Sequence, residues 1–243
     1  MNSILEKFKN YLPEIENIFK ENIISVTIYG SIVKGNFIPK KSDLNVLIIC
    51  KKNIPEQFIK FSPLFLKLNR KINFYPLILT KDEIKNSADI FPMEFSDIKE
   101  HHITLKGKDI FKNLKIENKY LRLELETQIK GKLILLKESL LKFAKNKKNL
   151  KNIMLNSIPS IIIILKNVLI LNKIKNSISI DAIISKAEFI TKIKFDTLKK
   201  LIKIKNSNEK ISSSEILKIY SQYLKEIESL SNYIDKFKTS KLK

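Results

Sequence analysis

Cysteine, glycine and arginine are all scarce in this chain of 243 residues. The single cysteine, Cys50, excludes an internal disulfide framework and favours a reducing compartment, so a cytoplasmic location is expected. Because Cys50 ends an apolar run, we interpret it as a small buried hydrophobic residue. The segment from Met1 to Lys20 contains no unbroken apolar run, and no signal peptide is predicted there.

Long uninterrupted apolar runs are also missing. The most apolar segment, Ile153 to Leu171, is broken by polar residues and by a proline, among them Asn156, Pro159 and Lys166. Such a pattern is poor for a membrane span and typical of a buried helix. The sequence therefore predicts no membrane partner.

The chain has a net charge of +21, but only Arg70 and Arg122 among its 46 basic residues are arginine. The other basic residues are lysines that are scattered along the chain, and codons rich in A and T could account for many of them. A solvated, lysine-rich surface is therefore the main interpretation. A face that binds a polyanion such as RNA or a nucleotide stays open, because the charge acts whatever its origin.

Two of the four glycines, Gly30 and Gly35, flank a short segment that follows an apolar run. A strand that ends in Gly30-Ser31 and enters a helix leaves backbone N–H groups free to bind an anion such as phosphate. The Ser31 hydroxyl can donate to a phosphate oxygen, and Gly35 lets the loop turn back. Lysines near this turn would add positive charge; they are Lys34, Lys40 and Lys41.

A polar pair opens the next apolar run. Ser42 precedes Asp43, and Asn45 lies two residues further on. Side chains two apart in a strand point to the same side, so Asp43 and Asn45 would both face the phosphate-binding turn. Two oxygen ligands in this place predict a binding site for a Mg²⁺ ion that also contacts a triphosphate.

Composition divides the chain into two parts. Six of the seven prolines lie at or before Pro92, together with the strand-like apolar runs, and the pattern becomes almost entirely helical after Asn118. The predicted fold class is α+β, with a mixed sheet and flanking helices at 1–116 and a helical bundle at 117–243.

The expected elements alternate in the first part and are helical in the second. A capping box of Thr80 and Glu83 is predicted to open a short helix. The expected strands are 23–29, 44–50, 72–79 and 93–98; the expected helices are 4–20, 55–68, 117–143, 150–171 and 213–237, with shorter ones between 180 and 204.

The order of an apolar strand, Gly-Ser, a gap and Asp-hydrophobic-polar resembles the nucleotidyltransferase superfamily, which has the polymerase-β-like fold. The match covers residues 23–50. The resemblance implies transfer of a nucleoside monophosphate from a nucleoside triphosphate, with ATP expected, in the presence of Mg²⁺ or Mn²⁺. It assigns Gly30 and Ser31 to the β- and γ-phosphates, with Lys34, Gly35 and Ser42 beside them. Asp43 and Asn45 take the first two metal-ligand positions.

The family's third carboxylate lies on a later strand. Glu94 fits best, in the middle of the expected strand at 93–98, and Asp97 is the competing residue on the opposite face. The glycine that follows this strand in minimal members of the family would be Gly107. An asparagine at the second ligand position adds no charge, so nucleotide binding is favoured over rapid transfer.

A narrower resemblance links the runs at 42–47, 91–95 and 121–133 to bacterial nucleotidyltransferase-domain proteins of undefined function. The helical wheel places Arg122 and Glu126 on the apolar stripe of the helix at 117–143. They form either an ion pair at the domain interface or a contribution to the nucleotide cleft. In the second case Arg122 contacts the nucleotide and Glu126 is a base. Gly131 suggests close packing against another backbone.

Three functions follow as hypotheses. The first is a transferase that acts on the hydroxyl of a small molecule, a protein or RNA. The second is a non-catalytic nucleotide- or RNA-binding module, because Asn45 indicates weakened chemistry. The third is an antitoxin-like partner protein. The sequence does not determine the acceptor, the preferred base or the oligomeric state. For the oligomeric state, a homodimer is considered.

Overall fold

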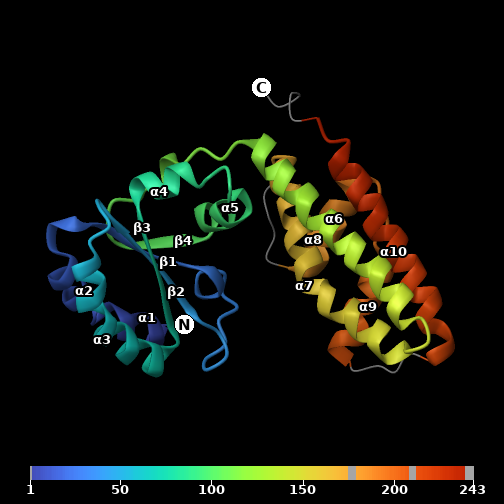
Figure 1. Ribbon diagram of the computed structural model, residues 1–243, viewed down its shortest axis with the longest axis horizontal. Coiled ribbons are helices and arrows are strands. Elements are labelled where there is room, and N and C mark those ends of the chain that lie inside the picture. Colours follow the sequence, from blue (N-terminus) through green and yellow to red (C-terminus); the bar gives the residue numbers. More distant parts are fainter. Residues whose placement is uncertain (1, 175–178, 208–211, 239–243) are drawn as a thin grey trace. The chain divides into compact units, whose positions relative to one another are not determined.

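The structure is a computed structural model that describes residues 2–174, 179–207 and 212–238. The chain divides into two compact units, Met1–Ile116 (unit 1) and Glu117–Lys243 (unit 2), and Figure 1 labels the elements of each. The boundary between the units lies between Ile116 and Glu117.

Unit 1 is built on a mixed sheet of four strands in the order β3-β2-β1-β4. The strands are β1 (Ile23–Tyr29), β2 (Leu44–Cys50), β3 (Phe74–Thr80) and β4 (His102–Gly107). β1 pairs antiparallel with β2 and with β4, whereas β2 pairs parallel with β3. The predicted α+β class is confirmed for unit 1, and β1 and β2 have the predicted bounds.

β2 is the most buried strand of the sheet because both of its faces are covered. On one face, Val46 and Ile48 pack in a cluster with α1 (Asn2–Lys9), α2 (Leu12–Phe19) and α3 (Pro55–Ile72). On the other face, Leu47 and Ile49 pack with α4 (Lys81–Asn86) and α5 (Pro92–Glu100). Cys50 is buried, and burial raises the pKa of its thiol to about 11, as expected for a residue that serves packing.

The N-terminal segment differs from the prediction of one helix over 4–20. It forms α1 and α2, with a break at Asn10 and Tyr11 and a proline, Pro13, in the first turn of α2. Proline lacks an N–H and favours the first turn of a new helix, so it interrupts a longer one. A short 3₁₀ helix, η1 (Lys20–Asn22), then leads into β1.

The prediction of a strand at 93–98 is wrong. The residues form α5, in which Pro92 occupies the first turn and the buried side chains follow helical spacing; these are Pro92, Met93, Phe95, Ser96 and Ile98. The short apolar run could be mistaken for an alternating strand because period alone does not separate a short helix from a strand. The fourth strand is β4 instead. It was not predicted because it is an edge strand with several polar residues and lacks a clear apolar run.

The capping box that opens α4 is present as predicted. The Thr80 hydroxyl accepts a hydrogen bond from the Glu83 backbone N–H at 3.1 Å. The Glu83 carboxylate accepts one from the Thr80 N–H at 2.7 Å, which lowers the pKa of Glu83. After β4, a third short 3₁₀ helix, η3 (Phe111–Asn113), is the last helical segment of unit 1.

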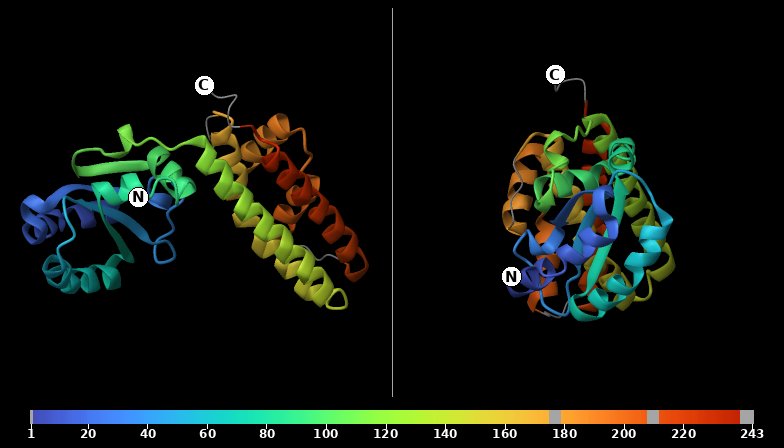
Figure 2. Two further views of the ribbon diagram at one scale, coloured as in Figure 1. Left: turned by 45° about the horizontal axis from the view of Figure 1, so that its top comes forward. Right: turned by 90° about the vertical axis from the view of Figure 1, so that its left-hand side faces the viewer.

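Unit 2 is a helical bundle, as the sequence predicts. Three long helices pack together, and Figure 2 shows them running alongside one another: α6 (Asn118–Phe143), α7 (Lys147–Leu171) and α10 (Ser213–Asp235). Two shorter helices, α8 (Ile180–Thr191) and α9 (Asp196–Ser207), complete the core against α7.

α7 is the one helix in the described part of the chain that is long and apolar enough to cross a membrane. Half of its most apolar window is buried inside unit 2. A core helix of a compact bundle has the same length and composition, so this property alone indicates a membrane span only weakly. The expectation of no membrane partner stays a prediction.

The two glycines outside the turn after β1, Gly107 and Gly131, differ in the space around them. A Cβ on Gly107 would lie 2.0 Å from the Ile24 carbonyl oxygen, and the backbone φ is +78°. A Cβ on Gly131 would meet nothing within 4 Å. The expectation of close backbone packing at Gly131 is therefore wrong, and Gly131 is exposed on α6.

Gly131→Ala is expected to stabilise unit 2 by about 1 kcal/mol, because alanine removes the conformational cost of glycine in a helix. Gly107→Ala serves as the contrasting variant and should destabilise unit 1 by more than about 2 kcal/mol, through strain at positive φ and a backbone clash. Scanning calorimetry of both variants measures the two shifts. Destabilisation by Gly131→Ala would show that α6 needs this glycine.

Candidate functional site

The predicted turn and the predicted polar pair meet at one edge of the sheet. β1 ends there, whereas β2, β3 and β4 all begin there, as the strand directions require. Across the strands, Asn45 stands opposite Tyr29 of β1 and opposite Tyr75 of β3. Gly30 and Ser31 directly follow Tyr29, so the turn lies beside Asn45 and Asp43.

Gly30 and Asn45 are in close contact. The φ of Gly30 is +80°, and a Cβ built on this residue would lie 2.8 Å from the Asn45 side-chain nitrogen. Gly30 is thus needed for its left-handed backbone, and the Asn45 side chain occupies the space beside it. The Asn45 side chain therefore lies against the turn at Gly30.

The turn after β1 is tight. Gly30–Ile32 form a single 3₁₀ turn, η2, and the Gly30 carbonyl accepts hydrogen bonds from Val33 and Lys34, both at 3.1 Å. Ser31 is half-buried, and within the described residues its hydroxyl has no hydrogen-bond partner. Gly35, with φ +79° and open space around it, turns the loop back as expected.

The loop from Gly35 to Asp43 is closed by Ser42. The Ser42 hydroxyl accepts a hydrogen bond from the Ile38 N–H at 3.0 Å, and the Ser42 N–H donates to the Ile38 carbonyl at 2.8 Å. Ser42 was predicted to contact the nucleotide. In the structure its oxygen first shapes the loop that delivers Asp43, and its own O–H remains available to donate.

Asp43 is exposed, and among the described residues its carboxylate has no hydrogen-bond or ion-pair partner. Strand alternation puts Asn45 on the same face of the sheet as Leu47 and Ile49, which is the face that carries α5. No group of three or more His, Cys, Asp or Glu side chains within residues 2–174, 179–207 and 212–238 lies close enough to hold a metal.

Lys34 does not stand free beside the turn. Its ammonium group donates to both carboxylate oxygens of Asp97 at 2.6 Å, and the lysine side chain is only 18% exposed. Asp97 belongs to α5, so this ion pair ties the loop after η2 to α5. His101 approaches the same carboxylate at 3.7 Å. The sequence predicted Lys34 as a source of charge for phosphate and did not predict its partner.

Glu94 does not occupy a strand, which corrects its predicted position as a third strand-borne ligand. The two strands after β2, β3 and β4, carry no acidic residue. Glu94 lies in the first turn of α5, where a carboxylate interacts favourably with the helix dipole. Asp97 follows three residues later, so the two carboxylates share one side of the helix instead of pointing to opposite faces.

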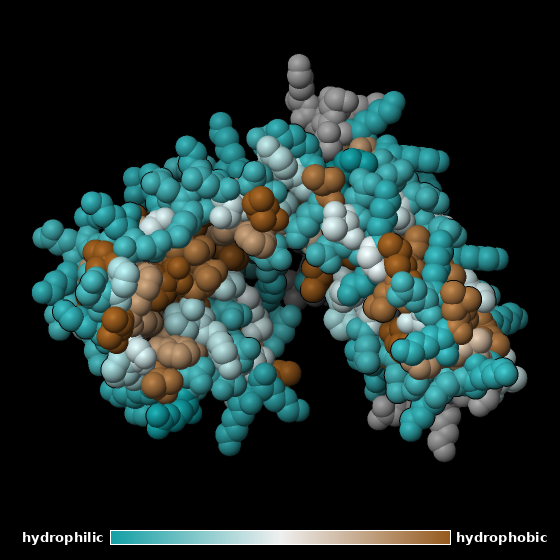
Figure 3. All heavy atoms as spheres, in the orientation of Figure 1, coloured by the Kyte–Doolittle hydropathy of each residue, from teal (hydrophilic) through white to brown (hydrophobic). Residues whose placement is uncertain are grey.

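Both acids line a pocket of about 390 Å³ on this face of unit 1. Its walls are mainly apolar, with Tyr29 from β1, Leu77 from β3, and Phe91 and Phe95 around the start of α5. Figure 3 shows hydrophobic side chains gathered in a hollow on this side of unit 1. Glu94 is exposed and has no ion-pair partner among the described residues, in contrast to Asp97.

Sequence reasoning missed Tyr29. Burial raises the pKa of its hydroxyl, and its ring contributes both to the pocket wall and to the cluster under α5. The available signal was strand alternation back from the Gly30 turn, which puts Tyr29 and Thr27 on the face of Asn45. The sequence did not show that α5 would cover that face.

Arg122 and Glu126 are both engaged within unit 2. The Arg122 guanidinium is 2.9 Å from a Glu126 carboxylate oxygen and donates to the backbone carbonyls of Ile234 and Asp235 at 3.2 Å and 2.6 Å. It thus caps the C-terminus of α10, where carbonyls lack helical partners. Glu126 also accepts from Lys130. The two residues thus form an ion pair within unit 2, whereas its predicted place at a domain interface and a nucleotide-contacting role both stay predictions.

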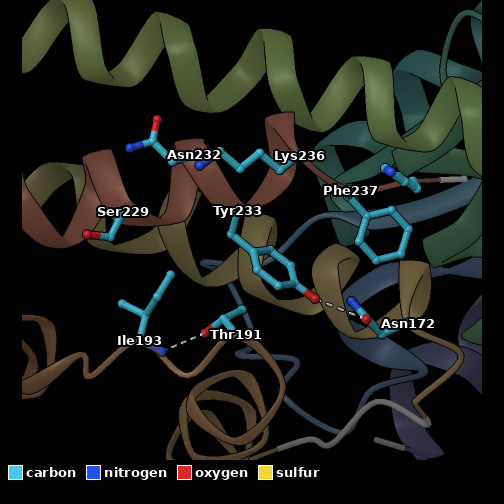
Figure 4. Close-up of a pocket in the computed structure, with 9 residues that line it drawn as sticks. Asn172, Thr191, Ile193, Ser229, Asn232, Tyr233, Lys236 and Phe237 are labelled. Atoms are coloured by element: carbon cyan, nitrogen blue, oxygen red, sulfur yellow. Dashed lines mark hydrogen bonds between the residues drawn. The ribbon is translucent and has the colours of Figure 1, made fainter.

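Unit 2 contains a wider hollow of about 670 Å³ near the end of α10 (Figure 4). The Tyr233 hydroxyl donates to the Asn172 side chain across it at 3.1 Å. Lys236 and Phe237 stand at its edge. None of the residues predicted for the nucleotide or the metal lines this hollow, so the candidate site remains the sheet edge of unit 1.

No protein-family model matches the chain, and no curated protein matches it significantly. Among solved structures, it is similar to spectinomycin adenyltransferase AAD(9) from Enterococcus faecialis, whose structure was determined with ATP and spectinomycin. The two chains are 14% identical; the match covers 95% of this chain and 99% of that chain, with a TM-score of 0.49. Similarity at this level indicates no function.

The Lys34–Asp97 ion pair predicts a link between α5 and the loop after η2. Asp97→Asn should make backbone amides in residues 31–42 exchange with solvent about fivefold faster, as for an interaction worth about 1 kcal/mol. Glu94→Gln, on the same side of the same helix, should leave the rates unchanged. Hydrogen exchange followed by mass spectrometry measures both. Equal rates in Asp97→Asn and the unaltered chain would contradict the link.

Proposed function

We propose that unit 1 binds a nucleoside triphosphate with Mg²⁺ and transfers its nucleoside monophosphate to an acceptor hydroxyl, as the resemblance to nucleotidyltransferases implies. The observation that carries the proposal is the contact between Gly30 and Asn45. The contact supports the proposal because the turn at Gly30 and Ser31 lies beside Asn45, and Asp43 precedes Asn45 by two residues on the same side of the chain.

The triphosphate would lie on the turn at Gly30 and Ser31. Ser31 has a hydroxyl without a partner within the described residues, and Gly30 allows close approach of the main chain. Lys34 would act mainly by holding the loop through Asp97, because its charge is already paired. ATP is the expected nucleotide.

The donor set fits one magnesium ion that is shared with the nucleotide. Mg²⁺ is usually held by one or two carboxylates together with substrate phosphates and water. Asp43 supplies an unpaired carboxylate and Asn45 an amide oxygen on the same side. When bound, the ion would neutralise charge on the phosphates and make the α-phosphorus more electrophilic.

The proposed transfer breaks one phosphoanhydride bond. The acceptor oxygen forms a bond to the α-phosphorus, the bond to the β-phosphate oxygen breaks, and pyrophosphate leaves with the electron pair. The hydroxyl proton passes to a carboxylate. Glu94 suits this role better than Glu126, because Glu94 is exposed and unpaired among the described residues whereas Glu126 is paired with Arg122.

A second candidate is a nucleotide-binding module without transfer. Two observations favour it: the amide of Asn45 adds no charge at the second ligand position, and no group of three His, Cys, Asp or Glu side chains in the described part of the chain could hold a metal. Binding would then use the same turn and the same Asp43. Measurements of turnover and of binding separate the two candidates.

Asp43→Ala tests the transferase directly. Incubation of the full chain with α-labelled ATP, Mg²⁺ and candidate acceptors should transfer label, and Asp43→Ala should reduce the rate by a factor on the order of 100 or more. Asp89→Ala, which removes another exposed aspartate of unit 1, is the matched control and should leave transfer unchanged. Thermal stabilisation by ATP without label transfer would establish the binding module instead.

Asn45→Asp should raise the affinity of the proposed site for Mg²⁺. A carboxylate adds a negative charge where the amide has none, so the Mg²⁺ concentration that half-saturates ATP-dependent stabilisation should fall on the order of tenfold. Any transferase rate should rise with it. Asn113→Asp, at an exposed asparagine of η3, controls for added charge. Unchanged Mg²⁺ dependence and unchanged rate would count against Asn45 as a ligand.

A further inference from the structure

Unit 1 has a second pocket that the proposed function does not use. It has a volume of about 430 Å³ and is lined by residues from α1, α3 and the loop that leads to Asp43. Four cations surround it, and no acidic residue lies among the described residues that line it. These cations are Lys7 of α1, Lys40 of the loop, and Arg70 and Lys71 of α3.

The cations are available for a ligand. Within the described residues, Lys7, Lys40 and Arg70 have no hydrogen-bond or ion-pair partner, whereas Lys71 donates only a long hydrogen bond, 3.4 Å, to the Tyr11 hydroxyl. Arg70 is one of two arginines in the chain, and the other, Arg122, is committed to α10. An unpaired guanidinium can bind a phosphate through two parallel hydrogen bonds.

The geometry points to a nucleic-acid strand as the ligand. The four cations are exposed and stand around the pocket, which suits a chain of phosphates that continues beyond the pocket better than a single enclosed anion. Phe37 and Ile72 supply apolar surface within the pocket against which a base can rest. The net charge of +21 would draw a polyanion to the molecule.

The pocket lies on the side of the sheet that α1 and α3 cover, and it reaches the loop that leads to Asp43. Ser42 lines it, and Asp43 follows Ser42 directly. We propose that this pocket binds the phosphates of a single-stranded RNA, whose terminal hydroxyl is the acceptor. The binding stands by itself, whereas the role of this strand as acceptor rests on the proposed function.

Fluorescence anisotropy of a labelled single-stranded RNA about ten nucleotides long tests the binding. The full chain is titrated without nucleotide or metal at about 50 mM and about 200 mM salt. Lys40→Gln with Arg70→Gln should weaken binding on the order of tenfold and should reduce the slope of log K against log salt by about 1.4, which is 0.7 for each lost phosphate contact.

Lys60→Gln with Lys85→Gln is the matched control, because it removes the same charge from two exposed lysines outside the pocket. It should change the affinity by about twofold at most. Equal losses in the two double variants would overturn the proposal, since only net charge would then matter. Failure of the unaltered chain to bind RNA, or displacement of RNA by equimolar tripolyphosphate, would also overturn it.

Asp43→Ala separates this proposal from the transferase proposal. RNA binding should persist in Asp43→Ala, because Asp43 does not line the pocket. If RNA binds and no variant transfers label, the transferase proposal fails and this site stands. If ATP is bound and its label is transferred to other hydroxyls but RNA is not bound, the reverse holds.

Discussion

The approach of Asn45 to Gly30 is the contact on which the candidate site of unit 1 depends. It exists because β1 and β2 pair antiparallel in a register that puts Tyr29 opposite Asn45, and because glycine leaves the space that a side chain would fill. Any shift of the register by one residue would turn Asn45 and Asp43 to the face covered by α1, α2 and α3. Burial in β2 does not distinguish the two registers, because Val46 and Ile48 on one face and Leu47 and Ile49 on the other are all fully buried, so the register depends on the pairing of β2 with β1 and β3.

The two faces of the sheet have different tasks. The face under α1, α2 and α3 is packed with aromatic and aliphatic side chains, including the stacked rings of Phe8 and Phe74, and gives unit 1 its rigidity. The face under α5 is only partly covered, and Tyr29 and Glu94 line a pocket on it. The Lys34–Asp97 ion pair connects this second face to the loop after η2, so α5 influences the geometry of the turn.

The cations of unit 1 are unevenly distributed over its surface. Lysines on much of the surface belong to local ion pairs or stand alone, as solvated charge does. Around the pocket of Lys7, Lys40 and Arg70, by contrast, several unpaired cations from separate segments come together without an acid. Sequence order disperses these residues over more than sixty positions, and only the packing of α1 and α3 on one face of the sheet collects them.

Local patterns in the sequence were sufficient for β1, β2, the Gly30 turn, the Thr80 capping box and the helical bundle. Each depends on residues close together in the chain: alternation in a strand, the backbone freedom of glycine, a hydroxyl three residues from a carboxylate, or apolar spacing of 3.6. Local patterns also led to the wrong prediction that Glu94 lies in a strand. A short apolar run with a polar residue in it fits both the two-residue period of a strand and the 3.6-residue period of a helix. Local patterns left Arg122 with two interpretations, since an arginine on an apolar stripe can face a core or a cleft.

Tertiary structure decided these points. Pro92 began a helix that packs on the sheet face beside Asn45, Asp97 paired with Lys34 from 63 residues away, and Arg122 capped α10 from 113 residues away. Such pairings are set by packing of elements that are distant in sequence, and no local pattern encodes them.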